Sequence, residues 1–235
     1  MRAIILAGGA GTRLKPFTTT IPKPLVPIGG EKPILEIVLG QLARHGCRRV
    51  TIAISRAANL IQSFFGDGTR FGLEIDYSVE ERPLGTVGPL TLIPDLPEDF
   101  LVMNGDILTD IDHRGLFDAH VAAKNDATVP IFRRRVHIDF GVVRHDADRR
   151  PVEFVEKPSY EVDVSMGVYC LRRAVIDRLP RGEPYGFDTL MIDGIARRDR
   201  IEVVPFDGFW LDIGRPEDYD RANESYAVLR KWLEP

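Results

Sequence analysis

The chain has 235 residues, of which 44% are hydrophobic and 28% are charged, as in an ordinary soluble globular protein with a proper core. Its formal net charge of −4 argues against a broad basic surface for nucleic acid, although this charge is compatible with a local cationic pocket for phosphates. No apolar run approaches the roughly 20 residues of a membrane-spanning helix, and residues 1–6 lead into glycines rather than into a signal peptide. We therefore expect a cytoplasmic protein that has neither a membrane nor a nucleic acid as its partner.

Short apolar segments rich in β-forming residues alternate along the chain with segments of helical period. The expected strands cover residues 3–7, 50–54, 75–79, 100–104, 127–132, 152–155 and 166–171. The expected helices cover residues 34–45, 60–65, 113–124, 188–197 and 216–229. This alternation predicts an α/β fold, a Rossmann-like three-layer sandwich around a mixed, mostly parallel central sheet.

Residues 133–158 interrupt the alternation, because they leave no room for a helix. Turn residues at 146–148 divide this segment into two or three strands, which predicts an antiparallel excursion from the sheet. The run Arg133, Arg134 and Arg135 is interpreted as a solvated edge. No repeat or Pro/Ser-rich linker divides the chain, so residues 1–235 are expected to form a single domain.

The two cysteines, Cys47 and Cys170, lie far apart in the sequence and have no metal-type partner nearby. This spacing argues against a disulfide framework and against a zinc site. Both side chains are expected to be buried as small hydrophobic groups.

A glycine-rich loop follows the first expected strand. Gly8, Gly9 and Gly11 allow backbone N–H groups to approach phosphate oxygens closely. The spacing fits neither the P-loop pattern nor the dinucleotide-binding pattern. Tight packing alone would explain the glycines, but Arg13 and Lys23 add the positive charge that a triphosphate needs.

The segment from residue 6 to residue 27 carries Leu-Ala-Gly-Gly-x-Gly-Thr-Arg-Leu followed by Pro-Lys-Pro-Leu. It resembles the signature of the sugar-phosphate nucleotidylyltransferases, which implies their GT-A-like fold. The resemblance implies that Arg13 stabilises the triphosphate and the leaving pyrophosphate, and that Lys23 contacts the reacting phosphates. It also places the following residues around the nucleotide: Leu6, Ala7, Gly8, Gly9, Gly11 and Thr12.

Two acidic residues are candidate ligands for a magnesium ion, which a nucleotidyl transfer would use. Asp106 ends a buried strand, where open α/β sheets bind ligands, although an aspartate there can also act as a turn or helix cap, as can Asp110 or Asp112. The motifs Asn-Gly-Asp and Trp-Leu-Asp-Ile-Gly-Arg-Pro resemble family motifs whose aspartates bind the metal. The resemblance thus implies Mg²⁺ on Asp106 and Asp212, with Asn104 beside the nucleotide.

The sugar 1-phosphate is assigned to a second set of motifs. Phe-Val-Glu-Lys-Pro puts an acceptor beside a cation, which taken alone would also fit a surface ion pair. It resembles the family's sugar-binding motif, in which Glu156 would bond the sugar and Lys157 its phosphate. The same resemblance assigns Gly141, Met166 and Gly167 to the sugar site, while Ser165 stands where many relatives carry asparagine or threonine.

The residues Glu80-Glu81-Arg82-Pro83-Leu84-Gly85-Thr86 resemble the family's base-recognition loop, and we align Glu80 with the base reader and Gly85 and Thr86 with the loop that follows. A carboxylate only accepts hydrogen bonds, so it can pair with both N–H groups on the edge of guanine but with only one on uracil or thymine. GTP is therefore favoured, with Glu81 as an alternative reader.

The motifs together look closest to the mannose 1-phosphate and manno-heptose 1-phosphate guanylyltransferase branch. The implied substrates are an NTP and a sugar 1-phosphate, and the products an NDP-sugar and pyrophosphate. A uridylyltransferase or thymidylyltransferase acting on a hexose 1-phosphate and a catalytically silent nucleotide-sugar-binding subunit remain alternatives. The sequence ends without the β-helix module of many relatives, and it leaves open whether the protein is a homodimer.

Overall fold

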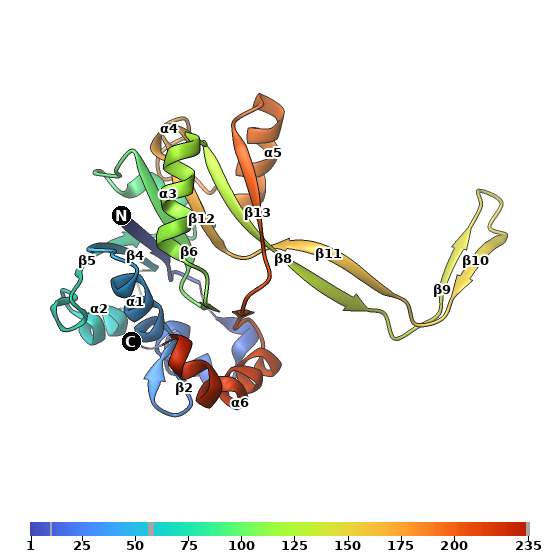
Figure 1. Cartoon of the computed structure of the whole chain (residues 1–235), viewed down its shortest axis with the longest axis horizontal. Helices are drawn as coiled ribbons and strands as arrows, with labels where there is room; N and C mark the ends of the chain where they lie inside the picture. The colour runs from blue at the N-terminus through green and yellow to red at the C-terminus, as the bar shows by residue number, and fades with distance from the viewer. Residues whose placement is uncertain (10, 56–58, 234–235) are drawn as a thin grey trace.

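The computed structural model describes residues 1–9, 11–55 and 59–233. An eight-stranded mixed sheet forms its centre, in the order β11-β8-β12-β6-β1-β4-β5, with β13 paired to β8 (Figure 1). Its strands are β1 (Arg2–Leu6), β4 (Arg49–Ser55), β5 (Glu74–Glu80), β6 (Asp99–Asn104), β8 (Ala127–His137), β11 (Ser159–Ser165), β12 (Val168–Arg172) and β13 (Ile201–Phe206). Only β11 and β12 run against the others, which confirms the mixed, mostly parallel sheet.

Helices and short turns cover the two faces of the sheet. The helices are α1 (Ile34–Arg44), α2 (Asn59–Phe65), α3 (His113–Ala123), α4 (Arg173–Ile176), α5 (Phe187–Arg197) and α6 (Pro216–Leu233). The 3-10 turns are η1 (Thr12–Leu14), η2 (Phe17–Thr19), η3 (Lys23–Leu25), η4 (Thr69–Phe71) and η5 (Gly88–Leu92). No helix of the described residues is both long and apolar enough to cross a membrane.

Alternation along the central strands explains the three layers. In β1, Ala3 and Ile5 pack against α1, α2 and α3, while Ile4 packs on the other face with η5, α4 and α5. Both cysteines are buried and free, as expected. A third apolar cluster joins η1, α1 and α6 around Leu14, Ile213 and Tyr226, and so supports the loops beyond the carboxyl ends of the strands.

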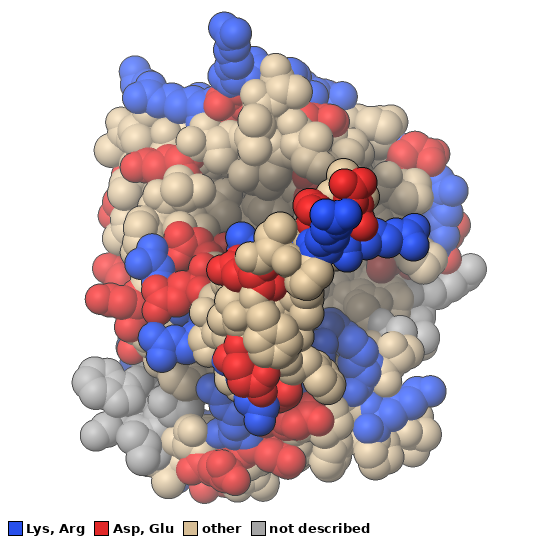
Figure 2. Space-filling model, turned by 90° about the vertical axis from the view of Figure 1, so that its right-hand side faces the viewer, with Lys and Arg blue, Asp and Glu red and all other residues tan. Residues whose placement is uncertain are grey.

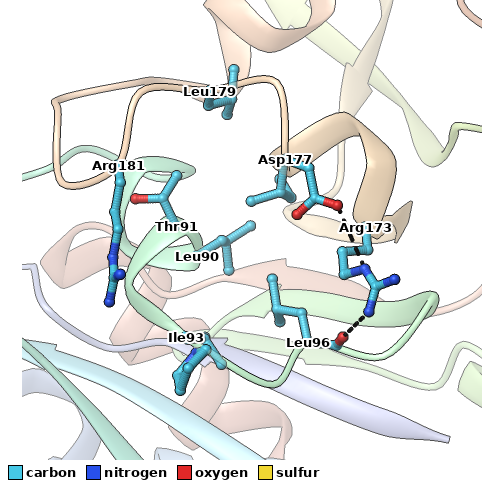
Figure 3. Close-up of a pocket in the computed structure, with 10 residues that line it drawn as sticks. Leu90, Thr91, Ile93, Leu96, Arg173, Asp177, Leu179 and Arg181 are labelled. Atoms are coloured by element: carbon cyan, nitrogen blue, oxygen red, sulfur yellow. Dashed lines mark hydrogen bonds and ion pairs between the residues drawn. The ribbon is translucent and has the colours of Figure 1, made fainter.

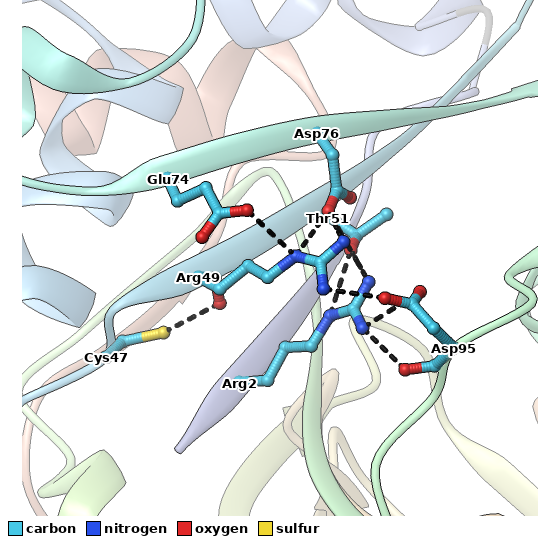
Figure 4. Close-up of polar contacts among 7 residues, drawn as sticks. All are labelled: Arg2, Cys47, Arg49, Thr51, Glu74, Asp76 and Asp95. Atoms are coloured by element: carbon cyan, nitrogen blue, oxygen red, sulfur yellow. Dashed lines mark hydrogen bonds and ion pairs between the residues drawn. The ribbon is translucent and has the colours of Figure 1, made fainter.

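Ion pairs link the amino-terminal ends of the parallel strands, at the end of the sheet opposite to these loops (Figure 4). Arg2 donates to Thr51 Oγ1 at 2.7 Å, and Arg49 pairs with both Asp76 and Asp95 at 2.6 Å. These contacts tie β1, β4, β5 and the segment before β6 together. They lie away from the glycine loop and serve the fold.

The excursion expected at residues 133–158 is present and forms an arm. Beyond Phe132, the last residue that pairs with β13, strand β8 is paired only with β11. The segment between them folds into a separate hairpin of β9 (Val142–His145) and β10 (Pro151–Val155), and the whole projects away from the body (Figure 1). We call residues 133–163 the arm.

Candidate active site

The carboxyl ends of the parallel strands carry the predicted nucleotide site. Strand β1 lies between β4 on one side and β6 on the other, so the strand order reverses beside β1, and ligands of open α/β sheets bind at such a point. The glycine loop follows β1 there, and Gly105 N donates to Leu6 O at 2.9 Å. Ala7 N bonds to Ala53 O at 2.8 Å, which fixes the start of the loop against β4.

The glycine loop leads directly onto the two predicted cations. Gly11 has a φ of +61°, and a Cβ on it would lie 3.2 Å from the Cβ of Lys23, so the backbone passes close beside this lysine. Buried Leu14 and Pro24 anchor η1 and η3 and thereby the positions of Arg13 and Lys23.

Strand pairing brings together the two predicted metal ligands. Strand β14 (Trp210–Asp212) pairs with β7 (Ile107–Thr109), and Ile213 N donates to Asp106 O at 3.1 Å. Burial raises the pKa of Asp212, and the charge of Asp106 raises it further, while Lys23 and Arg13 act in the opposite direction. The two carboxylates and two cations therefore form one electrostatic cluster.

Asp106 has an open coordination position. Its Oδ2 is paired with the Lys23 ammonium, and the side chains of Lys23 and Asp106 are only 11% and 24% exposed. Its Oδ1 is buried and has no hydrogen-bond partner among the described residues. A buried carboxylate oxygen without a partner is costly, and a divalent cation would satisfy it. The donor set thus fits a magnesium ion shared with Asp212.

The two other candidate aspartates, Asp110 and Asp112, accept hydrogen bonds from backbone N–H groups. Asp112 caps α3 by accepting bonds from Arg114 N and Gly115 N, both at 3.0 Å. Asp110 Oδ1 accepts from Phe209 N at 2.7 Å. The cap interpretation therefore applies to Asp112, whereas Asp110 fastens the segment before β14.

Glu80 lies against the glycine loop, where a base reader is expected. It is 8% exposed at the end of β5, and it accepts a bond from Leu84 N at 3.1 Å. Its carboxylate occupies the space that a side chain at Gly8 would fill, and burial raises its pKa. Glu81, the alternative reader, is exposed.

Gly85 and Thr86 connect the base-recognition loop to α5. Gly85 has a φ of +78°, and a Cβ there would lie 2.8 Å from Tyr185 O. Thr86 Oγ1 accepts from Phe187 N at 2.8 Å, at the first residue of α5. Both residues border the loop through backbone packing.

A pocket of about 180 Å³ adjoins Asp212. Its walls include Met166 and Gly167, which the sequence assigned to the sugar, and Asn104, which it assigned to the nucleotide. Trp210 Nε1 donates to Met166 O at 2.8 Å. The pocket is lined by Asn104, Ile107, Arg134, Val164, Ser165, Met166, Gly167, Tyr169, Trp210 and Asp212.

Arg134 corrects the interpretation of the arginine run. Arg133 and Arg135 are exposed and pair with Asp163 and Glu161 at 3.0 and 3.1 Å, as a solvated edge would. Arg134 points to the other side of β8, as alternation in a strand requires, and lines the pocket. No described residue forms a hydrogen bond or an ion pair with its side chain. Sequence reasoning missed it because the face of β8 was unknown.

The remaining sugar-site residues lie on the arm. A Cβ on Gly141 would lie 3.1 Å from Glu156 Oε2, so these two residues are neighbours. Lys157 follows with a φ of +45°, which is uncommon for a residue other than glycine. None of the three lines the pocket beside Asp212, so the structure separates them from the other predicted residues.

A second hollow, of about 210 Å³, lies elsewhere (Figure 3). Its walls come from η5, α4 and the segments next to them, and Arg173 there bonds to Leu96 O at 3.2 Å and pairs with Asp177 at 3.5 Å. It contains none of the predicted site residues, whereas the smaller pocket contains several of them.

A glycine loop, two cations and two carboxylates at the carboxyl edge of a mostly parallel sheet define an α/β protein that handles phosphates. The chain belongs to the Nucleotidyl transferase family, whose sequence profile matches residues 2–228.

Curated relatives named as guanylyltransferases and as uridylyltransferases both match almost the whole chain. A mannose-1-phosphate guanylyltransferase catalytic subunit beta from Drosophila pseudoobscura pseudoobscura is 34% identical over 93% of this chain and 60% of its own length. A UTP–glucose-1-phosphate uridylyltransferase from Synechocystis is also 34% identical, over 94% of this chain and 62% of its own. The chain thus spans about 60% of the length of such relatives.

The fold also matches solved structures. HddC from Yersinia pseudotuberculosis aligns with a TM-score of 0.75 and 27% identity, over 96% of this chain and 99% of HddC, and it has also been solved in complex with GMP-PN. The Rossmann-like nucleotidyltransferase fold expected from the sequence is therefore confirmed.

Proposed function

We propose that the chain is a sugar-1-phosphate nucleotidylyltransferase that makes an NDP-sugar and pyrophosphate from an NTP and a sugar 1-phosphate. The observation that carries the proposal is the convergence of Arg13, Lys23, Asp106 and Asp212 beside the glycine loop. Their charges fit a triphosphate, its metal and the pyrophosphate that leaves. A silent nucleotide-sugar-binding subunit would have no need to retain all four.

The reaction needs no nucleophilic side chain. An oxygen of the sugar 1-phosphate attacks the α-phosphorus of the NTP, a new P–O bond forms, and the bond to the β-phosphate oxygen breaks. The attacking phosphate is already ionised near neutral pH, so no general base is required. Positioning and charge neutralisation by Arg13 and Lys23 supply the rate enhancement.

Asp106 and Asp212 would hold a magnesium ion. No described group of three or more His, Cys, Asp or Glu side chains could hold a metal by itself. The ion would therefore depend on substrate phosphates and water for its other ligands, which is the usual situation for magnesium. When bound, it would neutralise charge on the reacting phosphates.

GTP is the proposed nucleotide. The buried carboxylate of Glu80, held beside the glycine loop, can accept from both the N1–H and the N2–H of guanine. Relatives named for mannose-1-phosphate guanylyl transfer agree with this choice. A uridylyl or thymidylyl transfer to a hexose 1-phosphate is the second candidate, supported by the uridylyltransferase relative at equal identity.

The sugar 1-phosphate would occupy the pocket beside Asp212, and mannose or a manno-heptose is the proposed sugar. Gly167, Met166 and Ser165 form its wall, and Arg134 adds a cation that faces the pocket. We propose that Arg134 binds the sugar phosphate or a sugar hydroxyl, since a guanidinium offers several donors to oxygen. Glu156 and Lys157 would contribute from the arm.

Detection of the nucleotide-sugar product by mass spectrometry tests the proposal. The chain incubated with Mg²⁺, GTP and mannose 1-phosphate should form GDP-mannose, and omission of either substrate should abolish the product. Retained nucleotide-sugar binding without turnover on any pair of substrates would instead favour the silent subunit.

We further propose that residues 1–235 act as one catalytic unit in the cytoplasm.

A further inference from the structure

The arm leaves the body beside the active-site pocket and ends far from it. Arg134, Val164 and Ser165 lie at its base and line the pocket. The five residues from 133 to 137 continue β8 without a break, and at about 3.3 Å per residue they carry the chain about 17 Å outward before the hairpin begins. The hairpin of β9 and β10 extends the arm further (Figure 1).

The arm carries half of the predicted sugar site. Gly141 and Glu156 are neighbours at the base of the hairpin, and Phe154 packs directly over Gly141. Lys157 has the strained backbone of a positive φ, a feature that concentrates at functional sites. The other half of the site, with Asp212 and Arg134, remains on the body.

The paired ladder of β8 and β11 holds the outer part of the arm away from its own body (Figure 1). Strand β11 pairs with β8 in unbroken register from Ser159↔His137 to Ser165↔Ile131. Ion pairs of Arg133 with Asp163 and of Arg135 with Glu161 cross the same ladder. A return of the arm to its own body would have to bend this ladder.

The arm also exposes apolar side chains that a folded protein normally covers. Phe140 is 77% exposed, and Val152 and Phe154 are each 65% exposed. Seven of the fifteen large exposed hydrophobic side chains among the described residues lie on the arm: Val136, Phe140, Val143, Val152, Phe154, Tyr160 and Val162. A two-stranded ribbon is only marginally stable in water, so this arm needs a surface to pack against.

We propose that the arm docks on a second copy of the chain and delivers Glu156 and Lys157 into the partner's active site. This inference rests on the proposed function. A second copy is the occupant that fits. Its pocket, with Asp212 and Arg134, carries the predicted sugar-site residues that the arm does not carry. Figure 2 looks along the arm, which stands in front of the hollowed face of the body. Two copies that exchange arms about a twofold axis would cover both arms and complete both sites.

Complementation between two inactive variants tests the proposal. Lys157→Ala damages the arm half of a site, and Asp212→Asn damages the body half. In a mixed dimer, one site combines the intact body of one chain with the intact arm of the other. Co-expression in equal amounts should therefore restore about a quarter of the wild-type activity, since half of the dimers are mixed and one of their two sites is intact.

A matched pair of variants gives the control. Asp106→Asn and Asp212→Asn both damage the body half, so their mixture should stay inactive. If wild-type chain is active while Lys157→Ala with Asp212→Asn recovers nothing, the exchange of arms is wrong and the proposed function stands.

Cross-linking tests the exchange independently of activity. Burial raises the pKa of the Cys47 and Cys170 thiols, so a short bismaleimide should react with introduced cysteines instead. Arg134→Cys chains mixed with Lys157→Cys chains should give a covalent dimer, and Asp118→Cys mixed with Lys157→Cys should not. Absence of the first product would contradict the proposal, whether or not the wild-type chain turns over substrate.

Light scattering gives a third measurement. The wild-type protein should scatter light as a particle of twice the 26.4 kDa of one chain. Phe154→Asp should lower the measured mass towards that of one chain. A fully active wild-type monomer would overturn the proposal.

Discussion

Lys23 forms an ion pair with Asp106 across 83 positions of sequence, and this contact joins the phosphate loop to the carboxylate at the end of β6. The lysine occupies Oδ2 only, so Oδ1 remains buried without a described partner. One lysine can thus orient the carboxylate for a metal and still lie beside the reacting phosphates.

Asp106→Asn and Asp212→Asn should each lower kcat by about 10²–10³-fold, because the metal that would neutralise the developing negative charge loses a carboxylate ligand. Circular dichroism and the midpoint of thermal unfolding should remain close to wild type. Asp112→Asn is the control, since Asp112 caps α3 and should affect stability by about 1 kcal/mol at most while activity persists. Wild-type turnover by both site variants would remove the metal assignment.

Glu80→Gln should reduce kcat/KM for GTP by about tenfold or more, because an amide cannot accept both guanine N–H bonds. The variant should also reduce the ratio of kcat/KM for GTP to kcat/KM for UTP. Glu81→Gln, at the adjacent exposed position, should behave like wild type. An unchanged order of nucleotides in Glu80→Gln would show that another group reads the base.

Arg134→Ala should raise KM for the sugar 1-phosphate by about tenfold and leave KM for the nucleotide nearly unchanged, since a charged hydrogen bond contributes about 1.5–3 kcal/mol. Steady-state kinetics with each substrate varied in turn would measure this. The comparison is Arg135→Gln, whose side chain pairs with Glu161 on the opposite side of the strand. Equal effects of the two variants would argue against contact between Arg134 and the substrate.

His113 should make the protein less stable in mild acid. Burial, the larger cause, and the neighbouring His45 together lower the pKa of His113 to about 3, against the opposite effect of Asp112. The rings of His113 and His45 are hydrogen-bonded at 2.9 Å. The unfolded chain, with a histidine pKa of about 6.5, takes up a proton between pH 7 and 5 that the folded chain excludes.

The free energy of unfolding should therefore fall by about 2 kcal/mol from this residue as the pH falls from 7 to 5. Urea unfolding at several pH values would measure the slope. His113→Asn should flatten it, whereas His137→Asn, at an exposed site on the arm, should not. An unchanged slope in His113→Asn would mean that the imidazole gains its proton without unfolding.

The sequence predicted the central fold, and the structure brings the predicted nucleotide-site residues together, because both depend on local patterns. The spacing of apolar residues marks β1, β4, β5 and β6 in the sequence. The glycine loop directly follows β1, and the Asn-Gly-Asp motif lies at the end of β6. Strand β13 was missed, because its exposed edge position and Pro205 leave no clear alternation. Strand β11 was missed for a related reason, since both of its faces meet solvent on the arm.

The arrangement of the sugar site required the structure. The side to which Arg134 points depends on the register between β8 and β11, and the distance of Lys157 from the pocket depends on the direction of the whole ribbon. Both are long-range properties that no local motif encodes. The division of the predicted sugar-site residues between arm and body was therefore not predicted.

Pyrophosphate release with Mg²⁺ is the measurement that tests the central claim most directly. It should be followed over GTP, UTP, dTTP, ATP and CTP, each combined with mannose, manno-heptose, glucose and N-acetylglucosamine 1-phosphates. We expect release only when a nucleotide and a sugar phosphate are both present, with GTP and a manno-configured sugar the fastest pair. Absence of release from every pair, by folded protein that still binds nucleotide sugars, would contradict the assignment as a nucleotidylyltransferase.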